Sequence, residues 1–185
     1  IFANIIMLKR LLFNSKNLNV TVKRLCNQLI ENHNYFEKSV IIGLQPRGIF
    51  FAQRIINEIE KQISKKIKKG YLDTTFYRDD YRNNKKELDA KETMIPFSLD
   101  EKNVIIVDDV LFTGRTVRSA MEGIINFGRP NRIELLVLID RKFSREIPIQ
   151  ATYIGKSVNT VESQKILVNL KEQGHKNDKI WLIKN

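Results

Sequence analysis

One stretch near the middle of the chain decides the fold. It reads Val104-Ile105-Ile106-Val107-Asp108-Asp109-Val110-Leu111-Phe112-Thr113-Gly114-Arg115-Thr116. Its first four residues are apolar on both faces of an extended chain, which is typical of a buried parallel strand. Two carboxylates follow, and a short polar loop then leads into a helix. This order predicts an α/β domain, in which ligands bind beyond the carboxyl ends of the strands.

The loop after the two carboxylates has the chemistry of an anion site. Residues 113–116 offer hydroxyls and free backbone N–H groups at a helix N-terminus. Gly114 lets the backbone approach a ligand closely, and Arg115 adds a charged donor. Asp108 and Asp109 point to opposite faces of the strand, so we expect different roles for them. A purely structural interpretation of the same residues is an acidic strand end followed by a capped helix.

The rest of the chain alternates strands with helices, which predicts a mainly parallel, twisted sheet flanked by helices. Helices are predicted from a Ser15 N-cap to about residue 32, after Gly48 with Phe51 and Ile55 on the buried side, and over 116–127. Strands are predicted over 40–44, 71–76, 104–107 and 133–139, with short ones at 153–154, 166–168 and 180–183.

With 185 residues the chain is long enough for one well-cored domain. We expect an N-terminal extension over residues 1–14 and a single domain over residues 15–185. Residues 78–101 are polar, charged and almost without apolar periodicity. Long loops of this kind in compact domains are often functional, so this segment is a candidate flexible lid.

Composition limits the classes of site and of partner. There are 32 Lys and Arg residues against 21 Asp and Glu, a net charge of +11. This charge favours a phosphate-bearing ligand, RNA or DNA as partner, or else reflects a lysine-rich surface. A single cysteine, Cys26, excludes a disulfide framework, and two histidines disfavour a His-rich metal centre. We expect no membrane segment and no signal peptide, and hence a cytoplasmic protein.

The whole 104–116 stretch closely resembles the phosphoribosyl-diphosphate signature of type I phosphoribosyltransferases. Further segments are similar to one subfamily, the bifunctional pyrimidine-operon attenuation regulators and uracil phosphoribosyltransferases. They run in order from about Leu12 to the C-terminus and include Ile42-Gly43-Leu44-Gln45-Pro46-Arg47-Gly48-Ile49, Tyr77-Arg78-Asp79-Asp80, Gly128-Arg129-Pro130, Leu138-Ile139-Asp140-Arg141, Arg145-Glu146-Ile147-Pro148-Ile149 and Tyr153-Ile154-Gly155-Lys156.

The resemblance implies the type I phosphoribosyltransferase fold with a small hood and a lid loop. It implies a pentosyl transfer in which uracil and phosphoribosyl diphosphate give UMP and pyrophosphate with Mg²⁺. It also implies binding of the mRNA leader of the pyrimidine operon under the control of UMP or UTP, and a homodimer or higher homo-oligomer. Two alternatives stay open: an RNA-binding regulator with vestigial catalysis, and a phosphoribosyltransferase for another nucleobase.

The resemblance also assigns roles to individual residues, in four groups. Asp108 and Asp109 hold the ribose hydroxyls and lie near Mg²⁺, which is bound mainly through substrate, and with Arg47 they form the catalytic set. The 5′-phosphate and ribose site comprises Asp108, Asp109, Val110, Leu111, Phe112, Thr113, Gly114, Arg115 and Thr116. The pyrophosphate and lid residues are Arg47, Gly48, Arg78, Asp79 and Asp80. The base site comprises Phe112, Ile139, Asp140 and Arg141, and the RNA surface includes Arg24 and Lys156.

The sequence departs from the subfamily pattern at three places. Gln45-Pro46 replaces a basic or His residue followed by Thr, and the proline removes one N–H from the turn. The segment Lys142-Phe143-Ser144 is one residue longer than the usual Gly-His. Asn32 stands where an Arg is expected on the RNA surface. These departures leave both the catalytic and the RNA-binding activity to be tested.

Three features also have interpretations that involve no function. Phe112 disfavours a purine substrate, because the purine-salvage relatives have an acid there, but it is equally consistent with simple packing. The lysines of residues 65–69 are best explained as a solvated helix end. Cys26 is interpreted as a small buried helix residue rather than a nucleophile.

Overall fold

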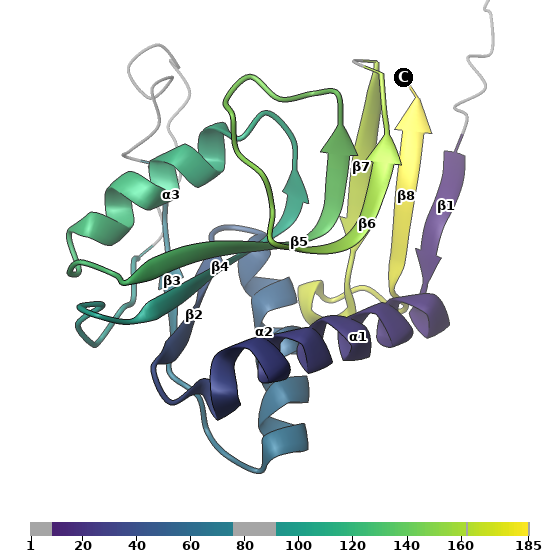
Figure 1. The fold of residues 1–185 in the computed structure, drawn as a ribbon. Helices are drawn as coiled ribbons and strands as arrows, with labels where there is room; N and C mark the ends of the chain where they lie inside the picture. Colours follow the sequence, from purple (N-terminus) through teal and green to yellow (C-terminus); the bar gives the residue numbers. More distant parts are fainter. Residues whose placement is uncertain (1–8, 76–91, 162, 185) are drawn as a thin grey trace, which may run out of the picture.

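Two β-sheets of different size organise the chain (Figure 1). The computed structural model describes residues 9–75, 92–161 and 163–184. The elements are β1 (Lys9–Asn14), α1 (Ser15–His33), η1 (Asn34–Phe36), β2 (Ser39–Leu44), α2 (Gly48–Ile63), β3 (Lys69–Leu72), β4 (Asn103–Leu111), α3 (Arg115–Ile125), β5 (Arg132–Lys142), β6 (Tyr153–Asn159), β7 (Gln164–Asn169), η3 (Lys171–Gln173) and β8 (Lys179–Lys184).

The larger sheet has five strands in the order β3-β2-β4-β5-β6, and every neighbouring pair is parallel. This confirms the expected α/β fold with a parallel sheet. The register places Asp108 of β4 beside Val137 of β5, and Leu111 beside Asp140. The carboxyl ends of β4 and β5 therefore meet at the same edge of the sheet.

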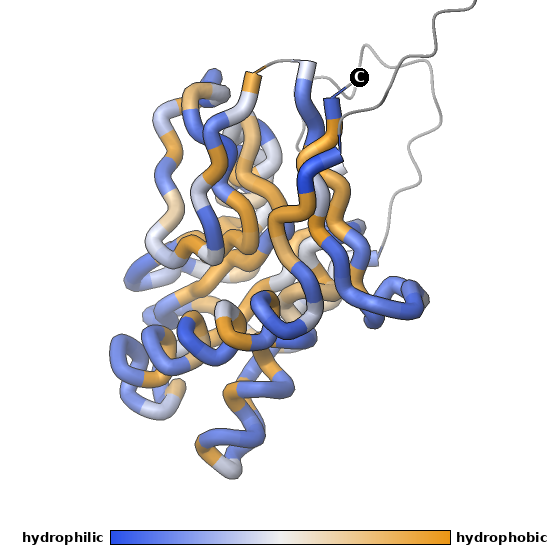
Figure 2. The backbone as a smooth tube through the Cα atoms, turned by 90° about the vertical axis from the view of Figure 1, so that its right-hand side faces the viewer, coloured by the Kyte–Doolittle hydropathy of each residue, from blue (hydrophilic) through white to orange (hydrophobic). Residues whose placement is uncertain are grey.

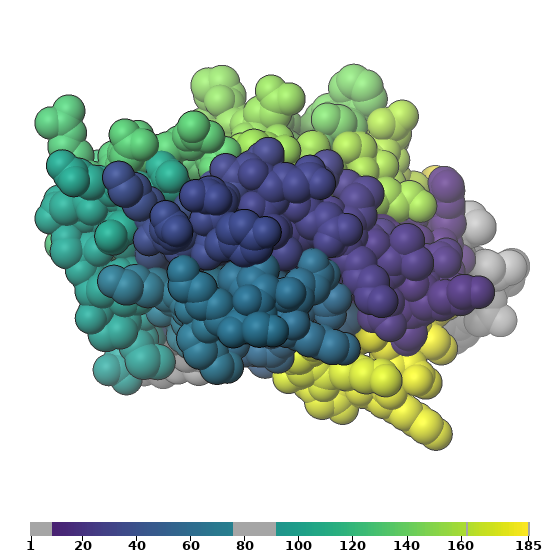
Figure 3. Space-filling model, turned by 60° about the horizontal axis from the view of Figure 1, so that its bottom comes forward, coloured from purple at the N-terminus to yellow at the C-terminus, as the bar shows by residue number. Residues whose placement is uncertain are grey.

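Two apolar cores cover the two faces of this sheet. Ile105 packs with α1 and α2 on one face, whereas Ile106 packs with α3 on the other. Because successive strand residues point to opposite faces, a strand buried on both sides must be apolar throughout. Figure 2 shows the resulting hydrophobic strands inside and hydrophilic helix turns outside. In Figure 3, α1 and α2 lie side by side across one face of the molecule.

The smaller sheet is antiparallel, in the order β1-β8-β7. It forms the expected hood, and it confirms the predicted strands near residues 166–168 and 180–183. Its third strand, β1, comes from residues 9–14, within the expected N-terminal extension. Leu12 and Phe13 are buried there. The pattern of residues 1–14 does not reveal this strand, because its hydrogen-bond partner β8 lies at the other end of the chain.

Several boundaries differ from the predictions. Helix α1 is capped by Asn14, whose Oδ1 accepts a hydrogen bond from Asn17 N at 2.9 Å. Ser15, the predicted cap, is the first helical residue. Strand β3 covers residues 69–72, and the strand predicted over 71–76 does not continue through residues 73–75, where Asp73 Oδ1 accepts hydrogen bonds from Thr75. Strand β4 continues through both aspartates to Leu111.

The candidate lid over residues 78–101 lies only partly within the described residues. Residues 76–91, which include Arg78, Asp79 and Asp80, lie outside the described residues. Residues 92–101 are packed against the domain: Leu99 is fully buried, and the backbones of Met94 and Tyr71 exchange hydrogen bonds of 2.8 and 2.9 Å. This part of the loop therefore belongs to the body of the domain.

Candidate active site

The two aspartates lie in the last part of β4 and line a pocket of about 600 Å³. Asp109 is buried and Asp108 is partly buried. Asp109 N donates a hydrogen bond of 2.8 Å to Asp108 Oδ1. Arg47 Nη2, at the start of α2, lies 2.9 Å from Asp109 Oδ2. The structure thus brings together the three residues that the sequence singled out as the catalytic set.

The aspartate pair is electrostatically strained. Burial, together with the negative charge of Asp109, raises the pKa of Asp108 well above its ordinary value, although the Asp109 N–H and Arg47 act in the opposite direction. Two adjacent carboxyls that resist ionising together are a common feature of functional sites. A positively charged ligand in the pocket would favour ionisation of both.

The carboxylates also fit a magnesium ion of the expected kind. Among the described residues there is no group of three or more His, Cys, Asp or Glu side chains that could hold a metal. Asp109 Oδ2, however, is buried and accepts no hydrogen bond from the described residues, since its contact with Arg47 is an ion pair without hydrogen-bond alignment. Mg²⁺ is commonly bound through one or two carboxylates plus substrate phosphates and water, so Asp108 and Asp109 suit that mode.

The expected anion cradle follows β4. Gly114 has a left-handed backbone with φ of 94° and caps α3, which begins at Arg115. The carbonyl of Thr113 accepts hydrogen bonds from Glu146 N and Ile147 N at 3.0 and 3.2 Å, which fix the loop. Thr116 lines the pocket, while Leu111 is buried and Arg115 Nε donates to Glu146 Oε2 at 2.6 Å.

The turn before α2 forms the opposite wall. Gln45, Pro46 and Arg47 line the pocket, and the Gln45–Pro46 peptide bond is cis. Gly48 packs so tightly on β4 that an added Cβ would lie 2.7 Å from Val107 O and 2.9 Å from Asp108 Cα. Only a glycine lets α2 approach the carboxylates this closely.

Phe112 and Arg141 form the third wall. The Arg141 guanidinium lies 3.8 Å from the centre of the Phe112 ring, and both side chains line the pocket. Phe112 is 42% exposed, so it is not a core packing residue. Arg141 Nε donates to Thr160 Oγ1 at 3.0 Å, whereas its buried Nη2 has no acceptor among the described residues. Ile139 and Asp140, also predicted at the base site, are buried behind this wall.

Some pocket residues were not predicted from the sequence. Thr74 and Thr75 follow β3, and Lys165 and Ile166 come from β7 of the smaller sheet. The two threonines could have been found, because they follow a parallel strand at the edge where ligands bind. Lys165 carries no such signal, since only the pairing of β7 with β8 brings it to the pocket.

The two positions predicted to face RNA lie along α1 and β6. Arg24 Nη2 donates hydrogen bonds of 2.9 Å to the carbonyls of both Ile154 and Gly155. Lys156, the next residue in β6, has its Nζ 5.5 Å from the centre of the Phe13 ring. Both side chains are exposed, so the structure brings them to one surface. Asn32 Nδ2 donates to the Tyr153 hydroxyl at 3.1 Å.

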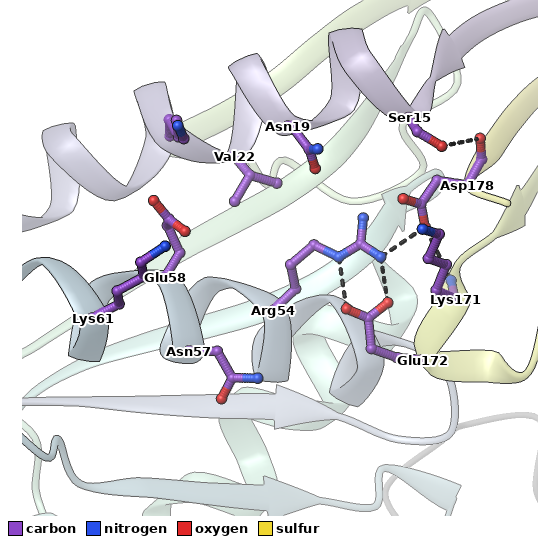
Figure 4. Close-up of a pocket in the computed structure, with 11 residues that line it drawn as sticks. Ser15, Asn19, Val22, Arg54, Asn57, Glu58, Lys61, Lys171, Glu172 and Asp178 are labelled. Atoms are coloured by element: carbon purple, nitrogen blue, oxygen red, sulfur yellow. Dashed lines mark hydrogen bonds and ion pairs between the residues drawn. The ribbon is translucent and has the colours of Figure 1, made fainter.

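A second hollow, of about 480 Å³, lies between α1 and α2 beside η3 (Figure 4). Its main feature is Arg54, whose guanidinium binds both carboxylate oxygens of Glu172 and donates to Asp178 Oδ1 at 2.7 Å. This cluster ties the C-terminal part of the chain to α2. Nearby, burial and the charge of Glu58 raise the pKa of Cys26 to about 12, which agrees with a structural rather than a nucleophilic thiol.

No helix among residues 9–75, 92–161 and 163–184 is long and apolar enough to cross a membrane.

Comparison with solved structures identifies the fold. A hypoxanthine phosphoribosyltransferase from Trypanosoma cruzi superposes with a TM-score of 0.72 at 13% identity, covering 95% of this chain and 96% of that one. A hypoxanthine phosphoribosyltransferase from Staphylococcus aureus gives a TM-score of 0.62 at 24% identity, covering 81% and 78%. These likenesses confirm the type I phosphoribosyltransferase fold.

Comparison of sequences gives the family. A family model described as a phosphoribosyl transferase domain matches residues 12–173. The bifunctional protein PyrR of Elusimicrobium minutum is 38% identical over 178 residues, which cover 96% of this chain and 99% of that protein. The bifunctional protein PyrR of Desulfosudis oleivorans is 41% identical over 157 residues, or 85% and 87% of the two chains. The chain therefore belongs to the phosphoribosyl transferase domain family and, within it, to the family of bifunctional PyrR proteins.

Proposed function

We propose that the protein transfers the phosphoribosyl group of phosphoribosyl diphosphate to uracil. The bond between C1 of the ribose and pyrophosphate breaks, and pyrophosphate leaves with the bonding electron pair. A bond forms from C1 to the uracil nitrogen, and the proton of that nitrogen is released to solvent. The products are UMP and pyrophosphate. The observation that carries this proposal is one pocket that gathers Arg47, Asp108, Asp109 and Thr116 with the Phe112–Arg141 wall.

Each wall of the pocket suits one part of the substrates. Asp108 and Asp109 accept hydrogen bonds from the ribose hydroxyls, and the loop 113–116 takes the 5′-phosphate at the N-terminus of α3. Arg47 faces the pyrophosphate, and its charge stabilises the leaving group. Magnesium, when bound at the two carboxylates and the substrate, supplies positive charge to the diphosphate oxygens. No protein nucleophile is required, because positioning and charge stabilisation carry the rate.

The Phe112–Arg141 wall supports a pyrimidine substrate. The Phe112 ring offers an apolar surface, and Arg141 Nη2, which has no acceptor in the part of the chain that the structure describes, can donate to a carbonyl oxygen of uracil. A purine nitrogen that needs a carboxyl partner finds none at Phe112. Ile139 and Asp140 contribute from behind the wall rather than by direct contact.

A panel of nucleobases tests this assignment. We expect the purified protein, with phosphoribosyl diphosphate and Mg²⁺, to turn over uracil and to leave xanthine, guanine and orotate unchanged. Turnover of one of the other bases in preference to uracil would contradict the proposed specificity and support a different phosphoribosyltransferase.

We propose as a second activity that the protein binds the mRNA leader of the pyrimidine operon in response to uridine nucleotides. The net charge of +11 and the exposed surface with Arg24 and Lys156 support it. The Arg24 guanidinium is engaged with β6, so we assign it mainly to orienting that surface. Tighter binding of the leader than of a scrambled RNA at physiological salt is the expected result, and equal affinity would contradict it. A cytoplasmic location and a homodimer or higher homo-oligomer belong to this proposal.

A further inference from the structure

Arg145 makes an unusual number of hydrogen bonds at the back of the pocket. Its Nη1 donates to the backbone carbonyls of Phe112, of Leu111 at 3.4 Å and of Arg141 at 3.0 Å. Its Nε donates to Ile149 O at 3.1 Å. Its Nη2 binds the buried carboxylate of Asp140. One guanidinium thus joins the ends of β4 and β5 and the segment that follows.

These contacts arise where both strands end. The pairing of β4 with β5 ends at Leu111 and Asp140, so Phe112 and Arg141, the next residues, have no partner across these two strands. A buried carbonyl without a donor is costly, and the five N–H groups of an arginine can satisfy several at once. The Arg145 side chain is only 23% exposed, so most of it is buried where the pairing of β4 with β5 ends.

The geometry connects Arg145 to the wall described for the base. Phe112 directly follows β4 and Arg141 lies in β5, and the Arg141 guanidinium stacks 3.8 Å from the centre of the Phe112 ring. Their backbone carbonyls accept from the same Nη1 of Arg145. Arg145 therefore contacts the backbone from which both of these side chains extend, although it is not among the residues that line the pocket.

The additional residue in Lys142-Phe143-Ser144 leaves these contacts in place. Phe143 has a positive φ of 61° and an exposed fraction of 89%, so the extra residue forms a turn directed to solvent. Lys142 Nζ lies 2.9 Å from Asp140 Oδ2 and gives that carboxylate a second cation. The extra residue therefore changes the solvent-facing surface beside Asp140 and leaves the contacts of Arg145 intact.

We propose that Arg145 is a positioning residue for the nucleobase, which holds Phe112 and Arg141 in the arrangement that binds uracil. This inference rests on the proposed uracil phosphoribosyltransferase activity. Arg145 contacts the backbone of Phe112 and Arg141 and does not contact Asp108 or Asp109. Its loss therefore weakens the binding of uracil more than that of phosphoribosyl diphosphate.

Steady-state kinetics of Arg145→Gln, Arg145→Lys and Lys142→Gln, with each substrate varied in turn, test the proposal. Loss of hydrogen bonds from a charged donor predicts a rise of about tenfold or more in the KM for uracil in Arg145→Gln. The KM for phosphoribosyl diphosphate should change by less than about twofold to threefold. Arg145→Lys keeps a cation beside Asp140 but loses the hydrogen bonds to the backbone carbonyls. Its KM for uracil should therefore lie between those of the wild type and of Arg145→Gln.

Lys142→Gln is the matched control. It removes the other cation from Asp140 but no backbone contact, so we expect a KM for uracil close to that of the wild type. An equal rise of the KM for uracil in Lys142→Gln would show that positive charge near Asp140 is responsible, and not the hydrogen bonds of Arg145 to the backbone.

Other outcomes separate failure of the positioning role from failure of the proposed function. If Arg145→Gln does not fold, Arg145→Lys combined with Phe112→Leu replaces it: effects on the uracil KM that simply multiply would show that Arg145 does not act through Phe112. An active wild type with unchanged or equally changed KM values for both substrates in the Arg145 variants would overturn the positioning role alone. A wild type that forms no UMP would overturn the proposed function itself.

Discussion

Arg47 Nη2 and Asp109 Oδ2 lie 2.9 Å apart and link the start of α2 to the central strand β4. The two side chains differ in environment, since Arg47 is 49% exposed and Asp109 only 5%. Removing one partner of such a pair leaves an uncompensated buried charge. Arg47 thus balances Asp109 before substrate binds and has an exposed side from which to reach a diphosphate.

Asp108→Asn should make the protein more stable at neutral pH while abolishing its activity. Burial and the charge of Asp109 raise the pKa of Asp108. A carboxyl with a raised folded pKa costs stability that grows as the pH rises from the unfolded pKa to the folded one. Asparagine keeps an acceptor for Asp109 N, so at pH 7 we expect Tm to rise by about 2–4 °C for each kcal/mol gained. A lower Tm in a thermal melt without ligands would contradict this reading.

Gly48→Ala should disable the site with little effect on the remote hood. The added Cβ would meet Val107 O at 2.7 Å and Asp108 Oδ1 at 2.9 Å, both in β4. The helix must move, and Arg47 moves with it, so we expect a loss of about 10²-fold in kcat/KM, as for other small displacements of a catalytic group. Gly174→Ala is the control for a glycine replacement that costs stability without moving α2: its φ of 88° strains an alanine, but the added Cβ meets nothing within 4 Å, so activity should stay at the wild-type level. Wild-type activity of Gly48→Ala would show that this close approach is not needed.

Asp178→Asn should weaken the link between the C-terminal segment and α2. Burial alone would raise the pKa of Asp178, but its hydrogen bonds from Arg54 and from Lys171 N outweigh burial and lower it. The lowered pKa contributes stability that is present above the unfolded pKa and is lost as the pH falls through the folded pKa.

At pH 7 we therefore expect Asp178→Asn to lose about 1.5 kcal/mol of unfolding free energy, as for one hydrogen bond to a charged group, because Arg54 keeps both bonds to Glu172. Urea denaturation should show this difference shrinking below about pH 4, where the unfolded carboxyl is protonated. A difference that stays constant between pH 7 and pH 3 would mean that the charge of Asp178 is not responsible.

Lys156→Gln should reduce the salt dependence of RNA binding. Each phosphate contact that a lysine makes adds about 0.7–0.9 to the slope of log affinity against log salt concentration, depending on the RNA structure. We expect the slope for the leader RNA to fall by about one in this variant. Lys65→Gln, in the exposed bend just after α2, is the control and should leave the slope unchanged. Equal slopes for Lys156→Gln and the wild type would remove Lys156 from the RNA surface.

The local parts of the fold were predictable from the sequence. Strand β4 and its two aspartates follow from an apolar run with acids at its end, and α2 follows from the spacing of Phe51, Ile55 and Ile59. The parallel sheet follows from the alternation of such strands with helices. In each case the signal and the structure lie within about twenty residues of each other, on the scale of one strand–helix unit.

Features formed across long sequence separations were not predictable. Strand β1 needs β8 as its partner, and Arg54 meets Asp178 across 124 positions. Lys165 reaches the pocket only through the smaller sheet. Arg145 belonged to a recognisable motif, but its five contacts depend on how the ends of β4 and β5 come together. The polarity pattern of a short segment does not predict contacts between residues so far apart in the chain.

The most direct test is the formation of UMP from uracil, phosphoribosyl diphosphate and Mg²⁺, measured for the wild type and for Asp109→Asn. Asp109 contacts Arg47 and lines the pocket, so its charge should be essential. We predict UMP formation by the wild type and a rate at least about 10²-fold lower in the variant. A wild type that forms no UMP, or an Asp109→Asn variant as active as the wild type, would contradict the assignment of this pocket as the active site.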